Sequence, residues 1–351
     1  MTAQLSAGAA GVWMLALWAA PLQAQAKAPA TVEASGLELV TPAAQQAIQR
    51  GLEYLRGQQR DDGSFGSGNI YRRNVAITSL AGMAFLSAGN TPQRGKYGKT
   101  VSSTLKFVMQ SADGSGFINV RDSSSHGPMY GHGFATLFLA EAYGMSPEPS
   151  LRDKLAQAVN LIVNTQNKEG GWRYQPLPED ADVSVTVCQI MALRAARNCG
   201  ISVPKETVDR CIQYIQRCQN ADGGFKYQMK GNAQSAFPRS AAGLVALYSA
   251  GIYEGPEIDR GLKYLQAFVP QGREIPRHES HYFYGHYYAV QAMWHAGGDQ
   301  WLAWYPAIRE ELLQRQLGDG SWGDPICNEY GAAMACIVLQ MPNNYLPIFQ
   351  R

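Results

Sequence analysis

Two aspartates one residue apart, Asp180 and Asp182, are the side chains best suited to acid chemistry in this sequence. They stand in GGWRYQPLPEDADVSVT (170–186), directly before an apolar run that predicts a helix. A carboxyl group that stays protonated inside an apolar pocket can donate its proton to a substrate. An aspartate here also fits an N-cap, because its side chain accepts hydrogen bonds from unpaired amides at a helix start. We expect Asp182 to cap the helix in either case.

The histidines form a second group with chemical potential, because all six fall in two stretches. The first stretch holds His126 and His132, and the second holds His278, His281, His286 and His295. Each stretch carries Tyr-Gly-His, at Tyr130–His132 and at Tyr284–His286. The positive end of a helix dipole favours a neutral imidazole, which can accept a proton or bind a metal. We predict that the rings of His132 and His286 open onto one cavity, with Tyr130 and Tyr284 at its rim; the alternative is that each ring bonds only within its own repeat.

Composition limits the classes of protein to consider. Apolar residues make up 46% of the 351 residues and charged residues 17%, enough for a sizeable core. The net charge is +2 without a basic cluster, which argues against nucleic acid as a partner. The six cysteines are predicted to be mainly small buried side chains in helices, with one disulfide between helices left open.

The N-terminal residues predict an export signal. An apolar stretch over about 9–22 is too short to span a bilayer and precedes Ala24-Gln25-Ala26, a signal-peptidase pattern. We therefore predict a signal peptide at 1–26, a flexible lead at 27–38 and one domain at 39–351, in an exported, periplasmic or secreted protein. An uncleaved anchor is the alternative, and no later segment is long and apolar enough to cross a membrane.

Positioning of these residues depends on a repeat with a period near 53 residues. The stretches QQRDDGSFG, QSADGSGF, QNKEGGWRY, QNADGGFKY and QLGDGSWGD end near Phe65, Phe117, Trp172, Phe225 and Trp322. The aromatic positions are separated by 52, 55, 53 and 97 residues, and the last gap is close to two periods. A degenerate fifth repeat is therefore expected between Phe225 and Trp322, which makes six repeats.

Each repeat combines an amphipathic helix, a Gly-rich turn and a helix that is apolar nearly all round, which indicates a buried second helix. Outer helices are predicted near 42–58, 96–110, 150–166, 204–219, 256–268 and 306–317. Inner helices are predicted near 73–89, 132–144, 182–199, 237–251, 285–297 and 329–341. Six such pairs predict an all-α fold, an α/α toroid of two concentric rings whose inner helices start at one rim. An open solenoid is the alternative, but the apolar C-terminal MPNNYLPIF does not resemble a polar capping repeat.

The pattern Gln-x-x-x-Gly-x-Trp, intact at Gln166–Trp172 and Gln316–Trp322, resembles the repeat of squalene–hopene cyclases and protein prenyltransferase β-subunits. The whole chain looks most like exported bacterial prenyltransferase and squalene-oxidase repeat proteins. The resemblance covers about residues 42–340 and implies the toroid fold. It does not by itself imply an activity.

Two site expectations follow from this resemblance. The cyclases carry Asp-x-Asp-Asp-Thr after Gly-Gly-Trp, and its middle aspartate, which protonates an alkene, matches Asp182. Val183 departs from the motif, and the chain is too short for the second domain of the cyclases. In the prenyltransferases Asp, Cys and His bind zinc, but only His286 has a counterpart here, so we predict no cofactor: zinc is not supported by a full ligand set.

Three functions remain open from the sequence. The first is binding, and conversion by Asp182 or Asp180, of a hydrophobic isoprenoid in the central cavity. The second is a polysaccharide lyase or hydrolase, since Tyr, His and Arg side chains can act on uronates. The third is a non-catalytic binding module with an unidentified protein partner. Candidate ligand-binding residues are Tyr130, Tyr284, His281, His126 and Arg239. We expect the first function, with an apolar cavity floor as its structural mark.

Overall fold

The computed structural model describes, apart from Met1, residues 36–120, 127–231, 233–270 and 280–350. Residues 32–351 form one compact unit, to which all elements below belong. Apart from Met1, the predicted signal peptide lies outside the described residues, as do residues 27–35 of the predicted lead. The same is true of His126 and His278.

Helices alternate along the chain between an outer and an inner layer. The outer helices are α2 (Pro42–Gln58), α4 (Gly98–Gln110), α6 (Pro149–Asn164), α8 (Lys205–Cys218), α10 (Pro256–Gln266) and α12 (Gly298–Arg315). The inner helices are α3 (Val75–Ser87), α5 (Pro128–Met145), α7 (Val183–Asn198), α9 (Phe237–Ala250), α11 (Tyr282–Ala296) and α13 (Asn328–Leu339). Within the described ranges no residue belongs to a β-strand.

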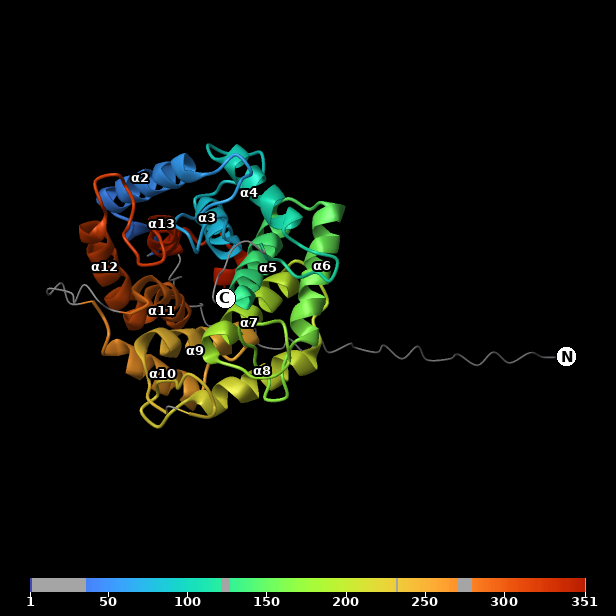
Figure 1. Cartoon of the computed structure of the whole chain (residues 1–351). Helices are drawn as coiled ribbons and strands as arrows, with labels where there is room; N and C mark the ends of the chain where they lie inside the picture. Colours follow the sequence, from blue (N-terminus) through green and yellow to red (C-terminus); the bar gives the residue numbers. More distant parts are fainter. Residues whose placement is uncertain (2–35, 121–126, 232, 271–279, 351) are drawn as a thin grey trace. The chain divides into compact units, whose positions relative to one another are not determined.

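The inner helices close into a ring. Each packs against the next inner helix, and α13 packs back against α3 (Figure 1). Each outer helix packs against the inner helices beside it, and α2 contacts both α12 and α13. The prediction of an all-α toroid of six helix pairs is therefore confirmed, and α10 and α11 form the degenerate fifth pair.

Burial follows the two layers. In α8 only one face is buried, through Thr207, Cys211, Tyr214, Ile215 and Cys218. In α9 every residue from Ser240 to Ala250 is buried. This is why the sequence of an outer helix has a polar side and that of an inner helix has almost none.

A glutamine in the repeat ties neighbouring repeats together. Gln166 Nε2 donates to the carbonyl of Gly170 in its own turn and to that of Thr207 in α8, both at 2.9 Å. Gln316 Nε2 makes the same pair of bonds to Gly320 and to Ala47 in α2, again at 2.9 Å. The bond to Ala47 joins the sixth repeat to the first.

The glycine of the turn is required by close packing. Gly170 has a φ of 103°, and a Cβ there would lie 2.2 Å from the carbonyl oxygen of Arg210. Only glycine tolerates both the left-handed backbone and this approach. The following Trp172 is buried and donates its indole N–H to the carbonyl of Ile162 at 2.7 Å, so the turn is held on α6.

Three helix starts differ from the prediction by three residues or more, and one of them is α11, which starts at Tyr282 rather than at 285. Helix α12 starts at Gly298 rather than near 306, because Pro306 lies inside the helix instead of in its first turn. Trp301, Trp304 and Tyr305 are fully buried, and their packing stabilises the part of the helix that precedes and surrounds the proline. Helix α5 starts at Pro128 rather than at 132, since proline is well suited to a first helical turn.

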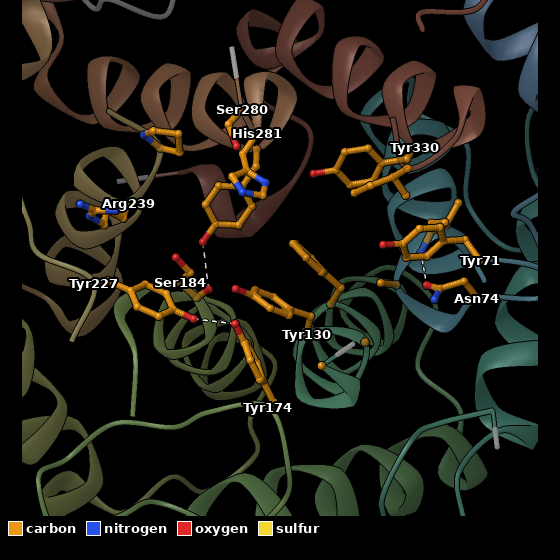
Figure 2. Close-up of a pocket in the computed structure, with 18 of the residues that line it drawn as sticks. Tyr71, Asn74, Tyr130, Tyr174, Ser184, Tyr227, Arg239, Ser280, His281 and Tyr330 are labelled. Atoms are coloured by element: carbon orange, nitrogen blue, oxygen red, sulfur yellow. Dashed lines mark hydrogen bonds between the residues drawn. The ribbon is translucent and has the colours of Figure 1, made fainter. Parts of the chain in front are cut away.

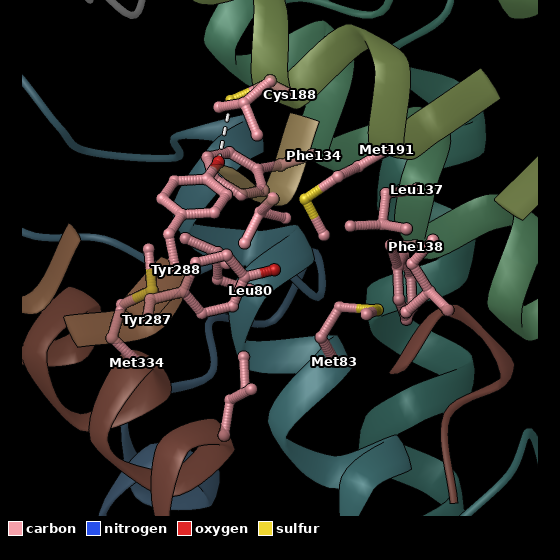
Figure 3. Packing of buried hydrophobic residues seen from close by; sticks show 14 of the residues in the cluster. Leu80, Met83, Phe134, Leu137, Phe138, Cys188, Met191, Tyr287, Tyr288 and Met334 are labelled. Atoms are coloured by element: carbon pink, nitrogen blue, oxygen red, sulfur yellow. Dashed lines mark hydrogen bonds between the residues drawn. The ribbon is translucent and has the colours of Figure 1, made fainter. Parts of the chain in front are cut away.

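Side chains fill the centre of the inner ring below the helix starts. Phe134 of α5 and Tyr287 of α11, from opposite repeats, meet edge to face with ring centroids 6.1 Å apart (Figure 3). The Tyr288 hydroxyl lies 3.3 Å from the Cys188 sulfur of α7. The filled centre divides the ring into two ends.

The C-terminal segment covers the end at which the inner helices finish, which we call the closed end (Figure 1). Its short helix η2 (Pro347–Phe349) is followed by Gln350. Trp294 Nε1 donates to the carbonyl of Phe349 at 3.0 Å, and Arg194 Nη2 donates to that of Gln350 at 2.9 Å. The segment is therefore held by side chains from α11 and α7.

No helix in the described part of the chain has the length and apolar character needed to span a membrane. All six cysteines are free thiols, and five of them are buried, Cys199 being half-buried. The expectation of mainly buried thiols is confirmed.

Candidate functional site

A cavity of about 730 Å³ lies where the inner helices start, and we call it the rim cavity (Figure 2). All six inner helices contribute to its wall. The helical residues that line it are Ala76, Ile77, Tyr130, Gly131, Phe134, Ser184, Pro238, Arg239, Tyr284 and Tyr330. The other lining residues are Tyr71, Asn74, Gly127, Tyr174, Tyr227, Ala236, Ser280, His281 and Ile326. Its volume is in the range usual for small-molecule sites.

Tyrosines dominate the wall of the rim cavity. Six of them line it: Tyr71, Tyr130, Tyr174, Tyr227, Tyr284 and Tyr330. Burial holds the pKa values of Tyr130, Tyr284 and Tyr330 well above the ordinary value of 10, so these hydroxyls stay protonated. Among the described lining residues there is no Asp or Glu. The wall therefore offers neutral hydroxyls on an aromatic surface.

Asp182 caps α7, as predicted. Its Oδ1 accepts a hydrogen bond from the Val185 amide at 2.8 Å. The side chain is fully buried and is not part of the cavity wall. Asp182 thus lies behind the wall rather than in it.

The second carboxylate oxygen of Asp182 is connected to the cavity through tyrosines. Asp182 Oδ2 accepts a hydrogen bond from the Tyr227 hydroxyl at 3.1 Å. The Tyr227 and Tyr174 hydroxyls lie 2.6 Å apart, and both residues line the cavity (Figure 2). Burial raises the pKa of Asp182 to about 6, although hydrogen bonds from Val185 and Tyr227 and the charge of Arg173 oppose the rise.

Asp180 has a different position from Asp182. Its side chain is half exposed and forms an ion pair with Arg173, whose Nε lies 3.8 Å from Asp182 Oδ2. Asp180 does not line the rim cavity. Its contact with the candidate site is indirect and runs through Arg173.

His132 has a structural position, and the prediction that both histidine rings open onto one cavity is wrong for it. Its Nδ1 accepts from the Ile118 amide and its Nε2 bonds the Ala158 carbonyl, both at 3.2 Å. Thr186 occupies the corresponding place in the third repeat, where its hydroxyl accepts from the Trp172 amide at 3.1 Å. The histidine therefore locks the Gly-aromatic turn to the inner helix, as the threonine does.

His286 is also buried and does not line the cavity, so the prediction is wrong for this ring as well. Its ring packs among the rings of Phe237, Tyr282 and Trp304, and Nδ1 has no hydrogen-bond partner among the described residues. Burial lowers the pKa of His286 to about 3 and that of His132 to about 4. The predicted neutral state is confirmed, but burial is its main cause rather than the helix dipole.

Four of the other predicted site residues line the rim cavity: Tyr130, Tyr284, His281 and Arg239. The Tyr284 hydroxyl donates a hydrogen bond to the Ser184 carbonyl at 2.9 Å, so Tyr284 is hydrogen-bonded at the rim of the cavity as expected. Arg239 Nε donates to the Phe225 carbonyl at 3.0 Å, so the guanidinium group is fixed at the wall. His126 lies outside the described residues.

Sequence reasoning missed Tyr71, Tyr174, Tyr227 and Tyr330. A signal for two of them was present, because Tyr174 and Tyr227 each follow the turn aromatic by two residues, in GGWRY and GGFKY. Equivalent positions in neighbouring repeats lie side by side, which brings these two hydroxyls together. Tyr330 was also marked, because Tyr330-Gly331 repeats the Tyr-Gly pair of Tyr130 and Tyr284 near an inner-helix start, whereas no comparable regularity marks Tyr71.

Metal binding has no visible support in the described part of the chain. There, no three His, Cys, Asp or Glu side chains come together in a way that suits a metal ion.

Solved structures with this fold serve several activities. A cellobiose 2-epimerase from Spirochaeta thermophila is 13% identical, with a TM-score of 0.65 over 90% of this chain and 98% of that one. The type II terpene cyclase MstE from Scytonema is 14% identical, with a TM-score of 0.60 over 87% and 98%. An α-1,6-mannanase from Salegentibacter is 9% identical, with a TM-score of 0.60 over 85% and 98%. At such identities the similarity concerns the fold alone.

The sequence itself gives a narrower assignment. No match was found among curated proteins. Residues 31–269, more than half of the chain, match the prenyltransferase alpha-alpha toroid domain. Together with the closed ring of six helix pairs, this match shows that the chain belongs to the prenyltransferase alpha-alpha toroid domain family.

Proposed function

We propose that the protein binds a hydrophobic isoprenoid in the rim cavity. The observation that carries the proposal is the lining of this cavity. Apolar groups of Ala76, Ile77 and Phe134 line it together with the rings of six tyrosines. Apolar and aromatic surfaces favour a hydrocarbon chain because burying it removes apolar surface from water.

The family supports the same substrate class. The chain belongs to a family named for prenyl transfer, and the structurally similar MstE is solved with geranylgeranyl dihydroxybenzoate. We propose that Asp182 is the acid if the bound isoprenoid is converted, since its carboxyl is buried and connected to the wall by Tyr227. In that case Asp182→Asn keeps the fold and abolishes conversion of a polyene.

Carbohydrate binding is the second candidate. It is favoured by the hydroxyls of the six tyrosines together with Arg239 and His281 in the same wall. A glycosidase would need two carboxyl groups beside its substrate, and the described lining residues include none. For this reason we place a sugar second.

A cavity-filling variant tests the proposal. A Cβ at Gly131 would meet Val75 and Ala76 at 3.7 and 3.8 Å, which are ordinary contacts, so a leucine there has room to extend into the cavity. Gly131→Leu should abolish binding of farnesene, a hydrocarbon isoprenoid, measured by calorimetric titration. Gly144→Leu, at an exposed position near the end of the same helix, is the matched control and should bind like the wild type.

The same titration distinguishes the two candidates. We expect farnesene to bind and cellobiose and mannotriose to give no signal. Binding of either sugar that Gly131→Leu removes, without binding of farnesene, would favour the carbohydrate function instead.

We also propose that the protein is exported and that its leader is cleaved near Ala26. The support is the apolar stretch and the Ala24-Gln25-Ala26 pattern. Determination of the N-terminal residue of protein purified from its native cells tests this. An intact Met1 would contradict cleavage.

A further inference from the structure

A chain of three side chains joins a buried carboxyl group to the rim cavity. Asp182 Oδ2 and the Tyr227 hydroxyl are 3.1 Å apart, and the Tyr227 and Tyr174 hydroxyls are 2.6 Å apart. Asp182 is fully buried, whereas both tyrosines line the cavity (Figure 2). A change in the protonation of Asp182 can therefore reach the cavity through oxygen atoms that are already hydrogen-bonded to one another.

The direction of this chain depends on the proton of Asp182. Each tyrosine hydroxyl has one proton to donate, and an ionised carboxylate only accepts. When Asp182 is ionised, Tyr227 donates to it and Tyr174 donates to Tyr227, so the Tyr174 oxygen presents lone pairs to other groups. When Asp182 is protonated, it donates to Tyr227, and Tyr227 donates to Tyr174. The proton of Tyr174 then points away from Tyr227 and is offered to the cavity.

We propose that Asp182, acting through Tyr227, sets whether the Tyr174 hydroxyl donates or accepts a hydrogen bond in the rim cavity, and that this hydroxyl recognises the oxygen-bearing end of an isoprenoid ligand. The inference rests on the proposed function, to which it adds a polar recognition point. A carbonyl end is bound when Asp182 is protonated. A hydroxyl end is bound in both states, because it both donates and accepts.

Asp182 changes its charge in the neutral pH range, whereas the titratable groups that act on it do not. Those that act on it come from the turn before α7 and from α5, α7, α8, α11 and the turn after α8. They are Arg173, Tyr130, Cys188, Tyr214, Cys218, Tyr284 and Tyr227. The pKa values of these thiols and hydroxyls are raised by burial, and the pairing with Asp180 raises that of Arg173. The pKa of Asp182 is about 6, so its charge changes between pH 5 and pH 8.

Three probes with the same carbon skeleton test the proposal: farnesene, farnesal and farnesol. Their dissociation constants are measured at pH 5 and pH 8 by calorimetric titration of the wild-type protein. Farnesal, whose carbonyl only accepts, should bind about three- to tenfold more weakly at pH 8, the range expected for one hydrogen bond. Farnesol and farnesene should bind equally at both pH values.

Matched variants identify the chain as the cause. Tyr227→Phe removes one oxygen and separates Tyr174 from Asp182, so the pH response of farnesal should disappear. Tyr330→Phe also removes one hydroxyl from the cavity wall. Tyr330 does not belong to the Asp182–Tyr227–Tyr174 series of hydrogen bonds, so this variant should retain the pH response of farnesal. His281→Gln removes the imidazole from the wall and should retain it as well. Circular dichroism verifies that each variant is folded.

The outcomes separate this inference from the proposed function. If farnesene does not bind, the proposed function fails. Suppose that farnesene binds. If farnesal then shows no pH response in the wild type, or keeps its response in Tyr227→Phe, the proposed control of Tyr174 by Asp182 is overturned, while the proposed function stands. Should Tyr227→Phe not fold, Asp182→Asn replaces it, with the same expectation that the response is lost.

Discussion

Asp182 and Glu141 are buried carboxyl groups at opposite ends of the inner ring, and they differ in what they contact. Asp182, at the helix starts, bonds Val185 and Tyr227 and is connected to the rim cavity. Glu141, at the closed end, lies near Arg194 and the backbone of Ile348 in the C-terminal segment. Burial raises the pKa of Asp182 to about 6 and that of Glu141 to about 8.

This difference shows that a shifted pKa alone does not identify a functional acid. The pKa values of both carboxyl groups lie near neutral pH for the same physical reason, which is the loss of water around the charged form. Only Asp182 has a path of hydroxyl groups to a cavity, whereas Glu141 faces a chain segment that fills its end of the ring. We therefore expect changes at the closed end to act on stability, and changes to residues that line the rim cavity to act mainly on binding.

The largest effect is expected from Phe349→Ala at the closed end. Phe349 is buried, and truncation of a buried phenylalanine typically lowers the free energy of unfolding by about 3–5 kcal/mol. Urea unfolding at pH 7 measures the loss. Farnesene affinity should not change, and a variant that stays stable but binds farnesene differently would show that the two ends are coupled.

Glu141→Gln should change how stability depends on pH. The pKa of Glu141 is raised from 4.5 to about 8, so the folded chain holds a proton that the unfolded chain releases. The stabilisation is complete below about pH 4.5 and is lost as pH rises to about 8, at roughly 1.4 kcal/mol for each unit between the two pKa values. Glutamine stays neutral, so the variant does not lose this stabilisation as the pH rises. Between pH 5 and pH 8, the difference in unfolding free energy between variant and wild type should therefore shift in favour of the variant by on the order of 3 kcal/mol.

Unfolding free energies of the wild type and Glu141→Gln at the two pH values provide the measurement. Taking the difference between the two proteins removes the opposite contributions of His132 and His286. Glu254→Gln, at an exposed position, is the matched control and should follow the wild type. Parallel pH profiles of the wild type and Glu141→Gln would contradict the buried neutral state of Glu141.

His132→Ala should lower the free energy of unfolding by about 2 kcal/mol, because the Ile118 amide and the Ala158 carbonyl both lose a buried partner. Thermal and urea unfolding measure this loss, and titration with farnesene should give the wild-type affinity. Weakened binding with unchanged stability would assign His132 to a ligand site despite its position.

The smallest effect is expected from Asp182→Ala. The variant loses the N-cap bond to the Val185 amide, which should lower the free energy of unfolding by roughly 1 kcal/mol. Asp180→Ala removes a half-exposed carboxylate two residues earlier in the sequence and should lower the free energy of unfolding less. An Asp182→Ala variant as stable as the wild type would show that the buried carboxyl offsets its own capping bond.

Much of the fold could be predicted from the sequence, because the signals were local and repeated. The Gln166 and Gln316 patterns, the glycine turns and the apolar inner helices each recur with one period, so six pairs followed directly. The start of α12 was missed because burial of Trp301 and Trp304 stabilises a helix through Pro306, and burial depends on the assembled ring rather than on local preference.

The site was harder to predict for the same reason. The cap at Asp182 is a local property and was found. The position of His132 was predicted wrongly because it depends on the alignment of the repeats. His132 occupies in the second repeat the position that Thr186 occupies in the third, and its ring accepts the equivalent amide hydrogen bond. The Tyr174–Tyr227 contact joins two repeats. Each tyrosine follows its turn aromatic by two residues, but this position does not by itself show that the two hydroxyls meet at a cavity.

The bond between Gln316 and Ala47 has a consequence for how the chain is made. These residues are separated by 269 positions, yet α2 needs α12 and α13 to cover it. At roughly 5–20 residues per second, synthesis leaves the first repeat without its final neighbours for on the order of tens of seconds. An open array of repeats can fold progressively as it emerges, whereas a ring is complete only when its last repeat has been translated. The apolar faces of α2 and α3 that pack against the sixth repeat are thus the surfaces that a chaperone would have to shield for longest.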